Sequence, residues 1–184
     1  GARLALYVIA GTVPLVIIGY LVKDFVTDEL RDPRVIAWAT IGFGILLFVS
    51  DRIGMTVRRI EHMTFGTAVI IGLSQILALI PGTSRAGITM TVARFLGFER
   101  AEAARFSLLL AMPAILGAGV LAGLDVYGSG NLRLGLDAVV AAGIAFVFAL
   151  IAIALMIRWL RRASFTPFVV YRLLLGAALL IWFV

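Results

Sequence analysis

The sequence has 184 residues, of which 62% are hydrophobic and 14% are charged, and its mean hydropathy is +1.12. Soluble domains are about half apolar and about a quarter charged, so this composition excludes a water-soluble fold and indicates a bilayer as solvent. The net charge of +6 does not indicate a nucleic-acid partner, because the arginines cluster in short loops between apolar stretches, a pattern that sets membrane orientation. The absence of cysteine excludes disulfides and thiol nucleophiles.

Five apolar stretches are candidates for membrane-spanning helices, because about 20 residues of helix cross the hydrocarbon core of a bilayer. They are roughly Leu4–Val22, Val35–Val49, Phe106–Leu124, Leu136–Trp159 and Phe168–Val184. The second stretch is short, and we expect its helix to extend into the flanking residues. No linker or low-complexity tract separates the five stretches. Residues 1–184 are therefore predicted to form a single polytopic domain of the all-α integral membrane class.

The segment at 65–97, between the second and third stretches, has a different pattern. Phe65–Ile80 is apolar, the turn-forming run Pro81–Gly87 interrupts it, and a second short helix is predicted at Ile88–Leu96. At 1.5 Å per residue, these arms of about 16 and 9 residues are roughly 24 Å and 14 Å long. Neither arm spans a core of about 30 Å, which favours a re-entrant helix–loop–helix over two full spans.

The charges of the loops support the same interpretation. The loop at 158–166 carries three arginines and no acidic residue, so it is predicted to be cytoplasmic. Counting back across the spans places residues 94–105 on the cytoplasmic side, and the arginines of residues 51–62 place that loop there too. Both flanks of the 65–97 segment then lie on one side of the membrane, as a re-entrant element requires.

Arg85, in the break between the two arms, is the only charged residue between Glu61 and Arg94. An arginine inside the bilayer costs roughly 2.5–3.5 kcal/mol on insertion scales. Unpaired backbone is tolerated at that depth only where it lines a polar cavity or is covered by protein. The break is therefore a candidate functional site.

Residues around the break offer the groups that a phosphate-binding site uses. The free N–H groups at the start of the second arm form a ready anion site, and Gly82 and Gly87 let the backbone approach a ligand closely. Arg85 presents a planar fork of donors that matches phosphate oxygens. Further hydroxyls come from Thr83, Ser84 and Thr89. The alternative is an ordinary helix-breaking turn, with Ser84 as the N-cap and Arg85 paired or reaching to the interface.

Other polar residues have more than one interpretation. Gln75 either faces the site or joins helices through hydrogen bonds, and Thr89 either binds the ligand or bonds back to its own helix. His62 is expected to be a loop histidine with no catalytic role. Interfacial roles are expected for four residues near the ends of the spans: the pair Asp51 and Arg52, and the anchors Tyr171 and Arg172.

The run Gly72–Gly87 reads Gly-Leu-Ser-Gln-Ile-Leu-Ala-Leu-Ile-Pro-Gly-Thr-Ser-Arg-Ala-Gly. It closely resembles the second signature of the undecaprenyl-diphosphate phosphatases, the membrane enzymes behind bacitracin resistance. The usual Pro-Gly-x-Ser-Arg-Ser-Gly is matched except at Ala86, and Thr89 stands where the family has its motif threonine. The resemblance continues through Ala104-Arg105-Phe106-Ser107, Met112-Pro113, Thr166-Pro167-Phe168 and Tyr171-Arg172-Leu173.

The resemblance implies a multi-pass hydrolase of the bacterial plasma (inner) membrane, built from two inverted repeats with one re-entrant element in each. It implies hydrolysis of the membrane lipid undecaprenyl diphosphate to the monophosphate and phosphate, which recycles the lipid carrier of peptidoglycan synthesis. Arg85 and Ser84 are then the candidate catalytic residues. The candidate substrate-binding residues are Gln75, Gly82, Thr83, Ser84, Arg85, Gly87 and Thr89.

The family's first re-entrant element, with its Glu-rich motif and Ser-Ser-Gly-His loop, has no match in this sequence, so we expect this chain to lack the N-terminal repeat segment. That element is implied to supply the base, the nucleophile and most ligands of a divalent cation, magnesium or calcium. No metal ligand is assigned within this chain, whose ten acidic residues lie in loops or at span ends. Two alternatives are a catalytically incomplete fragment and an inverted-repeat transporter or channel with an anion site. The sequence leaves open whether the protein forms a homo-oligomer.

Overall fold

The computed structural model describes residues 2–22, 30–128, 130 and 132–183, and its regular elements there are all helical. The α-helices are α1 (Ala2–Leu21), α3 (Pro33–Ile53), α4 (Phe65–Ser74), α5 (Arg85–Phe95), α6 (Arg100–Gly128), α7 (Leu132–Leu160) and α8 (Thr166–Phe183). Two short 3-10 helices are η1 (Ile60–His62) and η2 (Gln75–Leu79). The all-α prediction is therefore confirmed.

Five helices are long and apolar enough to cross a membrane, namely α1, α3, α6, α7 and α8. They cover the five predicted stretches, although Val184 lies outside the described residues. The short second stretch extends at both ends, as expected, and forms a helix of 21 residues. Asp32 caps its start by accepting a hydrogen bond from the backbone N–H of Arg34, and Pro33 suits the first helical position because its missing N–H is not needed there.

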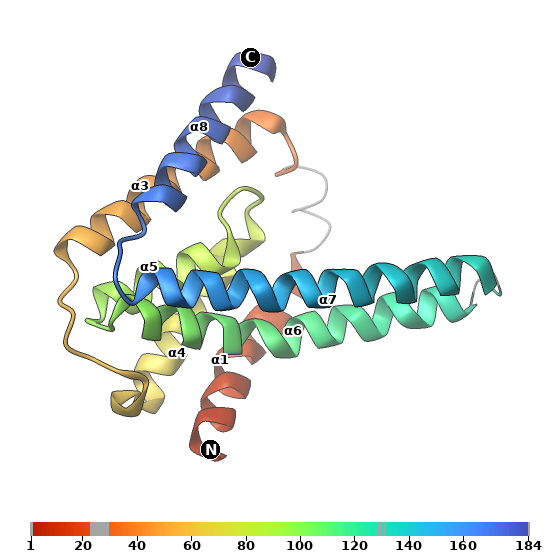
Figure 1. The fold of residues 1–184 in the computed structure, drawn as a ribbon, viewed down its shortest axis with the longest axis horizontal. Helices are drawn as coiled ribbons and strands as arrows, with labels where there is room; N and C mark the ends of the chain where they lie inside the picture. Colours follow the sequence, from red (N-terminus) through yellow and green to blue (C-terminus); the bar gives the residue numbers. More distant parts are fainter. Residues whose placement is uncertain (1, 23–29, 129, 131, 184) are drawn as a thin grey trace.

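Figure 1 shows how these helices are arranged. Helices α3 and α8 pack against each other, and α6 and α7 form a long hairpin whose tip reaches far from the other helices. Helix α5 lies between two buried apolar clusters and contributes to both, through Ala93 to one and Met90 to the other. The first cluster joins α1, α4 and α6, and the second joins α3, α6, α7 and α8. The break that precedes α5 is therefore held at the centre of the packed part of the molecule.

The 65–97 segment consists of two short helical arms that meet at the turn 80–84. Its two ends lie together, because the N–H groups of Val57 and Arg58 donate to the carbonyl of Gly97, and Glu99 N–H donates to the carbonyl of Arg58. Arg59 also pairs with Glu99 at 3.0 Å, and the hydrogen bond from that carboxylate raises the pKa of the Arg59 guanidinium. The segment therefore returns to where it started. Its placement as a re-entrant element within the bilayer stays a prediction.

A buried ionic cluster, made of Asp51, Arg94 and Arg100, ties four helices together. The Asp51 carboxylate accepts from Arg100 Nε at 2.6 Å and from the backbone N–H of Phe165 at 3.2 Å. Arg94 Nε lies 3.4 Å from the same carboxylate, and both side chains are almost fully buried, at 1% and 3% exposure. The cluster thus joins the end of α3, the end of α5, the start of α6 and the residue before α8.

The predicted interfacial pair of Asp51 and Arg52 is wrong. Asp51 turns inward to the ionic cluster, whereas the Arg52 guanidinium lies over the ring of Phe48, 5.1 Å from its centroid. Successive residues of a helix point about 100° apart, so neighbours in the sequence do not face each other. Asp51 instead meets arginines that lie more than 40 residues further along the chain.

We predict that Asp51→Ala lowers the free energy of unfolding by about 3–5 kcal/mol, because it leaves buried Arg94 without its counter-ion. Unfolding in detergent, followed by circular dichroism, measures this loss. The control is Glu61→Ala, which removes an exposed carboxylate and should change stability by no more than about 0.5 kcal/mol. Equal losses for the two variants would contradict the role assigned to Asp51.

Candidate functional site

The turn between η2 and α5 has a backbone shape that only certain residues accept. Gly82 has a φ of +93°, and a Cβ at this position would collide with the carbonyl oxygen of Ile36 on α3. The hydroxyl of Thr40, one turn further along α3, donates to the carbonyl of Ile36 at 2.7 Å and lies 3.3 Å from the Gly82 carbonyl oxygen. Gly82 is therefore required both by its φ and by its close contact with α3.

Ser84 sits at the start of α5 with a φ of 67°, which is unusual for a residue that has a side chain. Its hydroxyl oxygen accepts from the backbone N–H of Gly87 at 3.2 Å, so the serine is the helix N-cap. The side chain is exposed, which leaves its O–H free to donate to a ligand. The N-cap role and the predicted ligand role are thus compatible.

Arg85 is held in place by two hydrogen bonds. Its Nε donates to Gln75 Oε1 and its Nη2 donates to the carbonyl of Leu110 on α6, both at 2.7 Å. An arginine has five N–H donors, and in the described part of the chain Arg85 forms no other hydrogen bond. It therefore keeps donors for a ligand while its position is fixed.

Gln75 is fully buried and connects Arg85 to the first helix. Its amide oxygen accepts from Arg85, and its Nε2 donates to the carbonyl of Gly11 on α1 at 3.0 Å. Of the two interpretations from the sequence, the structure shows the helix-joining one. Both the oxygen and the nitrogen of the Gln75 amide have partners within the protein. A direct contact between Gln75 and a ligand stays a prediction.

Thr83 and Thr89 are both buried, at 0% and 1% exposure. The hydroxyl of Thr83 has no hydrogen-bond partner among the described residues. The hydroxyl of Thr89 donates back toward the carbonyls of Arg85 and Ala86 and also contacts the Ser107 hydroxyl. The structure therefore shows the back-bonding alternative for Thr89, and its role as a ligand stays a prediction.

Arg172 on α8 reaches the same turn from the other side, a position that the sequence did not reveal. Its Nη2 donates to the carbonyl of Gly82 at 2.7 Å and its Nε to the carbonyl of Thr40 at 3.3 Å. A Cβ at Gly87 would lie 3.5 Å from its Nη1. The predicted interfacial anchor is thus wrong for Arg172. The position of Arg172 in the sequence could have indicated this, because it lies six residues after Thr166 and therefore about 9 Å along the helix from its start.

A cavity of about 560 Å³ opens beside the turn. Its polar lining consists of backbone and side-chain groups of Gly82, Ser84, Gly87 and Arg172, together with Thr40 and Tyr171. Its remaining walls are apolar and come from α3, α5, α7, α8 and the residues before α8: Ile36, Leu47, Ala86, Met90, Met156, Phe165, Phe168, Leu175 and Leu179. The cavity therefore has a hydrogen-bonding end with one cation, Arg172, and an apolar remainder, which suits an anionic amphiphile. Arg85 is not among its lining residues, because its guanidinium is directed to Gln75 and to Leu110 of α6.

His62 lies away from this turn, in η1. Its Nδ1 accepts from the backbone N–H of Arg59 at 3.1 Å, and its side chain is exposed. Among residues 2–22, 30–128, 130 and 132–183, no group of three or more His, Cys, Asp or Glu side chains comes together to hold a metal ion. The acidic residues Asp24, Asp28 and Glu29 lie outside the described residues.

Residues 1–178 match the family described as Bacitracin resistance protein BacA. The chain belongs to this family. It is 52% identical to Undecaprenyl-diphosphatase 1 of Rhodospirillum rubrum over 98% of this chain and 64% of the relative. It is 46% identical to Undecaprenyl-diphosphatase of Roseobacter denitrificans, over 99% of this chain and 68% of the relative. It is 48% identical to Undecaprenyl-diphosphatase of Alteromonas mediterranea, over 100% of this chain and 68% of the relative.

These comparisons confirm the family resemblance seen in the signature turn. The chain spans about two thirds of the length of the BacA-family relatives that it matches. The family match, over residues 1–178, includes the turn, the two arginines on either side of it and every residue that lines the cavity except Leu179.

We predict that Arg85→Lys weakens binding of inorganic diphosphate to this BacA-family chain at least tenfold, because an ammonium group lacks the planar fork that matches two phosphate oxygens. Isothermal titration of the purified chain in detergent measures the affinity. Arg105→Lys, at an exposed arginine of α6 paired with Glu102, is the matched control and should leave the affinity unchanged. An Arg85→Lys affinity within twofold of the wild type would show that Arg85 does not bind phosphate.

Proposed function

We propose that the protein hydrolyses undecaprenyl diphosphate to undecaprenyl monophosphate and phosphate in the bacterial plasma membrane. In this reaction a water oxygen bonds to the terminal phosphorus as the bond from that phosphorus to the bridging oxygen breaks. The observation that carries the proposal is the placement of Ser84, at the start of α5, and of the cation Arg172 at one end of an apolar cavity. The names of the relatives, each an undecaprenyl-diphosphatase, support the same substrate.

The diphosphate is bound, in this proposal, at the start of α5. The first N–H groups of a helix carry partial positive charge and lack intrahelical partners, and Ser84, Ala86 and Gly87 at this helix start line the cavity. Arg85 supplies charge-assisted hydrogen bonds, and Gln75 keeps its guanidinium in position. Gly82 and Gly87 let the backbone come close to the phosphate oxygens. Charge stabilisation at this turn would lower the barrier as negative charge moves to the leaving phosphate.

The hydrolysis also needs a group that positions or deprotonates the attacking water. The Asp51 carboxylate is engaged by Arg94, Arg100 and the Phe165 N–H, and His62 accepts from the backbone of its own loop. Neither faces the turn. We therefore propose that the base comes from the part of the relatives that this chain does not match.

The same argument applies to a divalent cation. Magnesium and calcium prefer charged oxygen ligands, and the described residues bring no three acidic or imidazole side chains together. The side chains around the turn are hydroxyls, an amide and arginines, and such a set does not fit a divalent cation. We propose that its ligands, too, belong to the part of the relatives outside this chain.

The apolar part of the cavity would hold the start of the polyprenyl chain. Its walls are formed by side chains such as Met90, Phe168 and Leu175, and burial of apolar area contributes about 25 cal/mol per Å². A substrate with a diphosphate at one end and a hydrocarbon at the other matches both ends of this cavity. A free inorganic diphosphate would use only one of them.

We predict that the 184-residue chain by itself does not release phosphate from polyprenyl diphosphate at a measurable rate, because the residues that the structure describes bring donors and positive charge to the turn but no base. Phosphate release by the purified chain, with and without magnesium or calcium, measures this. Undecaprenyl-diphosphatase 1 of Rhodospirillum rubrum is the positive control.

The companion protein for this test joins the unmatched segment of that relative to the present chain. Its activity should approach that of the relative. Inactivity of the joined protein, although it folds and binds diphosphate, would contradict the proposed function. Rapid turnover by the 184-residue chain alone would show instead that the catalytic groups are misassigned, and Ser84 would become the leading nucleophile.

We also predict that Leu175→Trp weakens binding of a long-chain polyprenyl diphosphate at least fivefold, because the indole fills the apolar part of the cavity. Binding of inorganic diphosphate should not change. Leu174→Trp is the matched control, since Leu174 is 68% exposed and does not line the cavity. Equal effects of the two variants on the long-chain ligand, measured by titration, would place the hydrocarbon elsewhere.

A further inference from the structure

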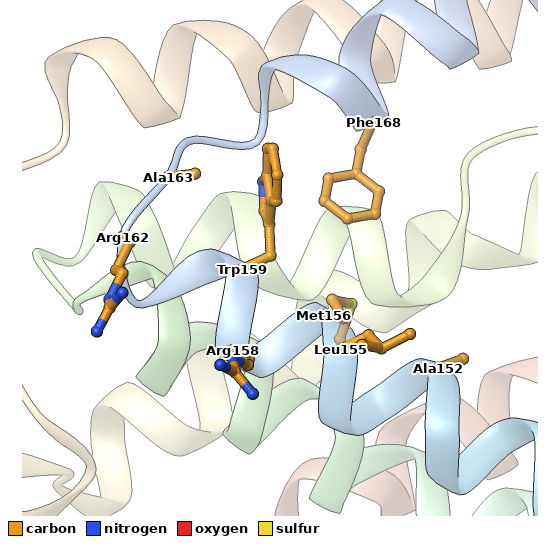
Figure 2. A pocket seen from close by; sticks show the side chains of 8 residues that line it. All are labelled: Ala152, Leu155, Met156, Arg158, Trp159, Arg162, Ala163 and Phe168. Atoms are coloured by element: carbon orange, nitrogen blue, oxygen red, sulfur yellow. The ribbon is translucent and has the colours of Figure 1, made fainter.

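A second groove, of about 690 Å³, lies on the outside of the hinge between α7 and α8. Figure 2 shows its lining residues, with Trp159 and Phe168 standing on the same side of α7 near Met156 and Leu155. Met156 and Phe168 are shared with the cavity beside the turn, whereas the other residues of the second groove are its own. The floor is apolar, and two arginines, Arg158 and Arg162, are also among the lining residues. In Figure 2 their side chains extend to the other side of α7 from Trp159.

The positive charge of these two arginines is not neutralised within the described part of the chain. Arg158 and Arg162 are exposed, and neither forms an ion pair with any of the described residues. The sequence contains no aspartate or glutamate after Asp137. The two guanidinium groups are therefore free to bind an anion from outside the chain.

Basic residues at the end of a helix do not by themselves indicate a ligand, because they also interact favourably with the helix dipole. Arg161 lies at the same helix end and serves as the comparison, since it does not line the groove. What distinguishes Arg158 and Arg162 is the apolar groove that begins beside them. The combination of paired cations with an adjoining apolar channel matches a phosphate head group and an acyl chain.

The aromatic wall of the groove is fixed in position. Trp159 Nε1 donates to the carbonyl of Ser164 at 3.2 Å, and the Trp159 carbonyl accepts from the N–H groups of Arg162 and Ala163. These bonds hold the indole and the Arg162 backbone in one tight turn. The groove is thus a formed site and does not need to be assembled when a ligand arrives.

We propose that this groove binds an anionic diacyl phospholipid, with its phosphate on Arg158 and Arg162 and one acyl chain against Trp159, Leu155 and Phe168. The site is distinct from the candidate diphosphate site and does not depend on the proposed hydrolysis. The loop that carries the arginines is the one predicted to be cytoplasmic. Anionic phospholipids are attracted to basic segments near the membrane surface.

The test uses the fluorescence of Trp159. Substitutions Trp38→Phe and Trp182→Phe remove the other two tryptophans, both of which are exposed, at 64% and 84%, so the fold should be kept. The chain is placed in phosphatidylcholine bilayers that contain either brominated phosphatidylglycerol or the same mole fraction of brominated phosphatidylcholine. We expect the anionic quencher to reduce Trp159 fluorescence at least twofold more than the neutral one.

The arginine variants decide whether the preference belongs to the groove. Arg158→Gln with Arg162→Gln should abolish the preference for the anionic quencher, and Arg161→Gln should preserve it. Equal quenching by the two lipids, or an equal loss in the Arg161→Gln variant, would overturn the proposal in favour of unspecific attraction to the loop. Displacement of the brominated lipid by polyprenyl diphosphate, but not by unbrominated phosphatidylglycerol, would show that the groove belongs to the substrate and would also overturn it.

Discussion

The fold depends on how the chain satisfies its backbone where the helix breaks between η2 and α5. The carbonyl of Gly82, left without a helical partner, accepts from Arg172 of α8 and lies 3.3 Å from the Thr40 hydroxyl of α3. On the opposite side, Arg85 donates to the carbonyl of Leu110 in α6. A break inside a bilayer must be satisfied by protein groups, so three helices are fixed around it.

The two arginines have different tasks because they approach the turn from different sides. Arg172 uses its Nη2 and Nε on backbone carbonyls of the turn and of α3, so its contacts stabilise the shape of the loop. Arg85 is held at its Nε and Nη2 but belongs to the first turn of α5, where the free N–H groups lie. Gln75 connects Arg85 to α1, so a shift of α1 would move the guanidinium. Gln75 thus links α1 to the candidate anion site.

The sequence predicted the fold well because hydropathy and arm length are local properties. The five spans and the break between the two arms follow from composition and helix rise. The break is shorter than predicted, because α5 begins at Arg85 and not at Ile88. The side-chain partners could not be predicted in the same way. Asp51 meets Arg94 and Arg100 only because α3, α5 and α6 converge, and Arg172 meets Gly82 across 90 residues of sequence. The turn of the candidate site could thus be recognised in the sequence. The residues that hold the turn in place could be identified only once the packing of the helices was known.

The shared walls of the two grooves have a consequence for the substrate. Met156 of α7 and Phe168 of α8 line both the cavity beside the turn and the groove at Arg158 and Arg162. A lipid that occupies one groove contacts the same side chains as a lipid in the other, so the two occupants cannot be energetically independent. Coupling between binding sites is reciprocal: whatever an anionic phospholipid does to the affinity for a polyprenyl chain, that chain does equally to the affinity for the phospholipid. The sign of this coupling depends on whether Phe168 adopts one position that suits both chains, because one aromatic ring between two hydrocarbon ligands either packs against both or is displaced by one.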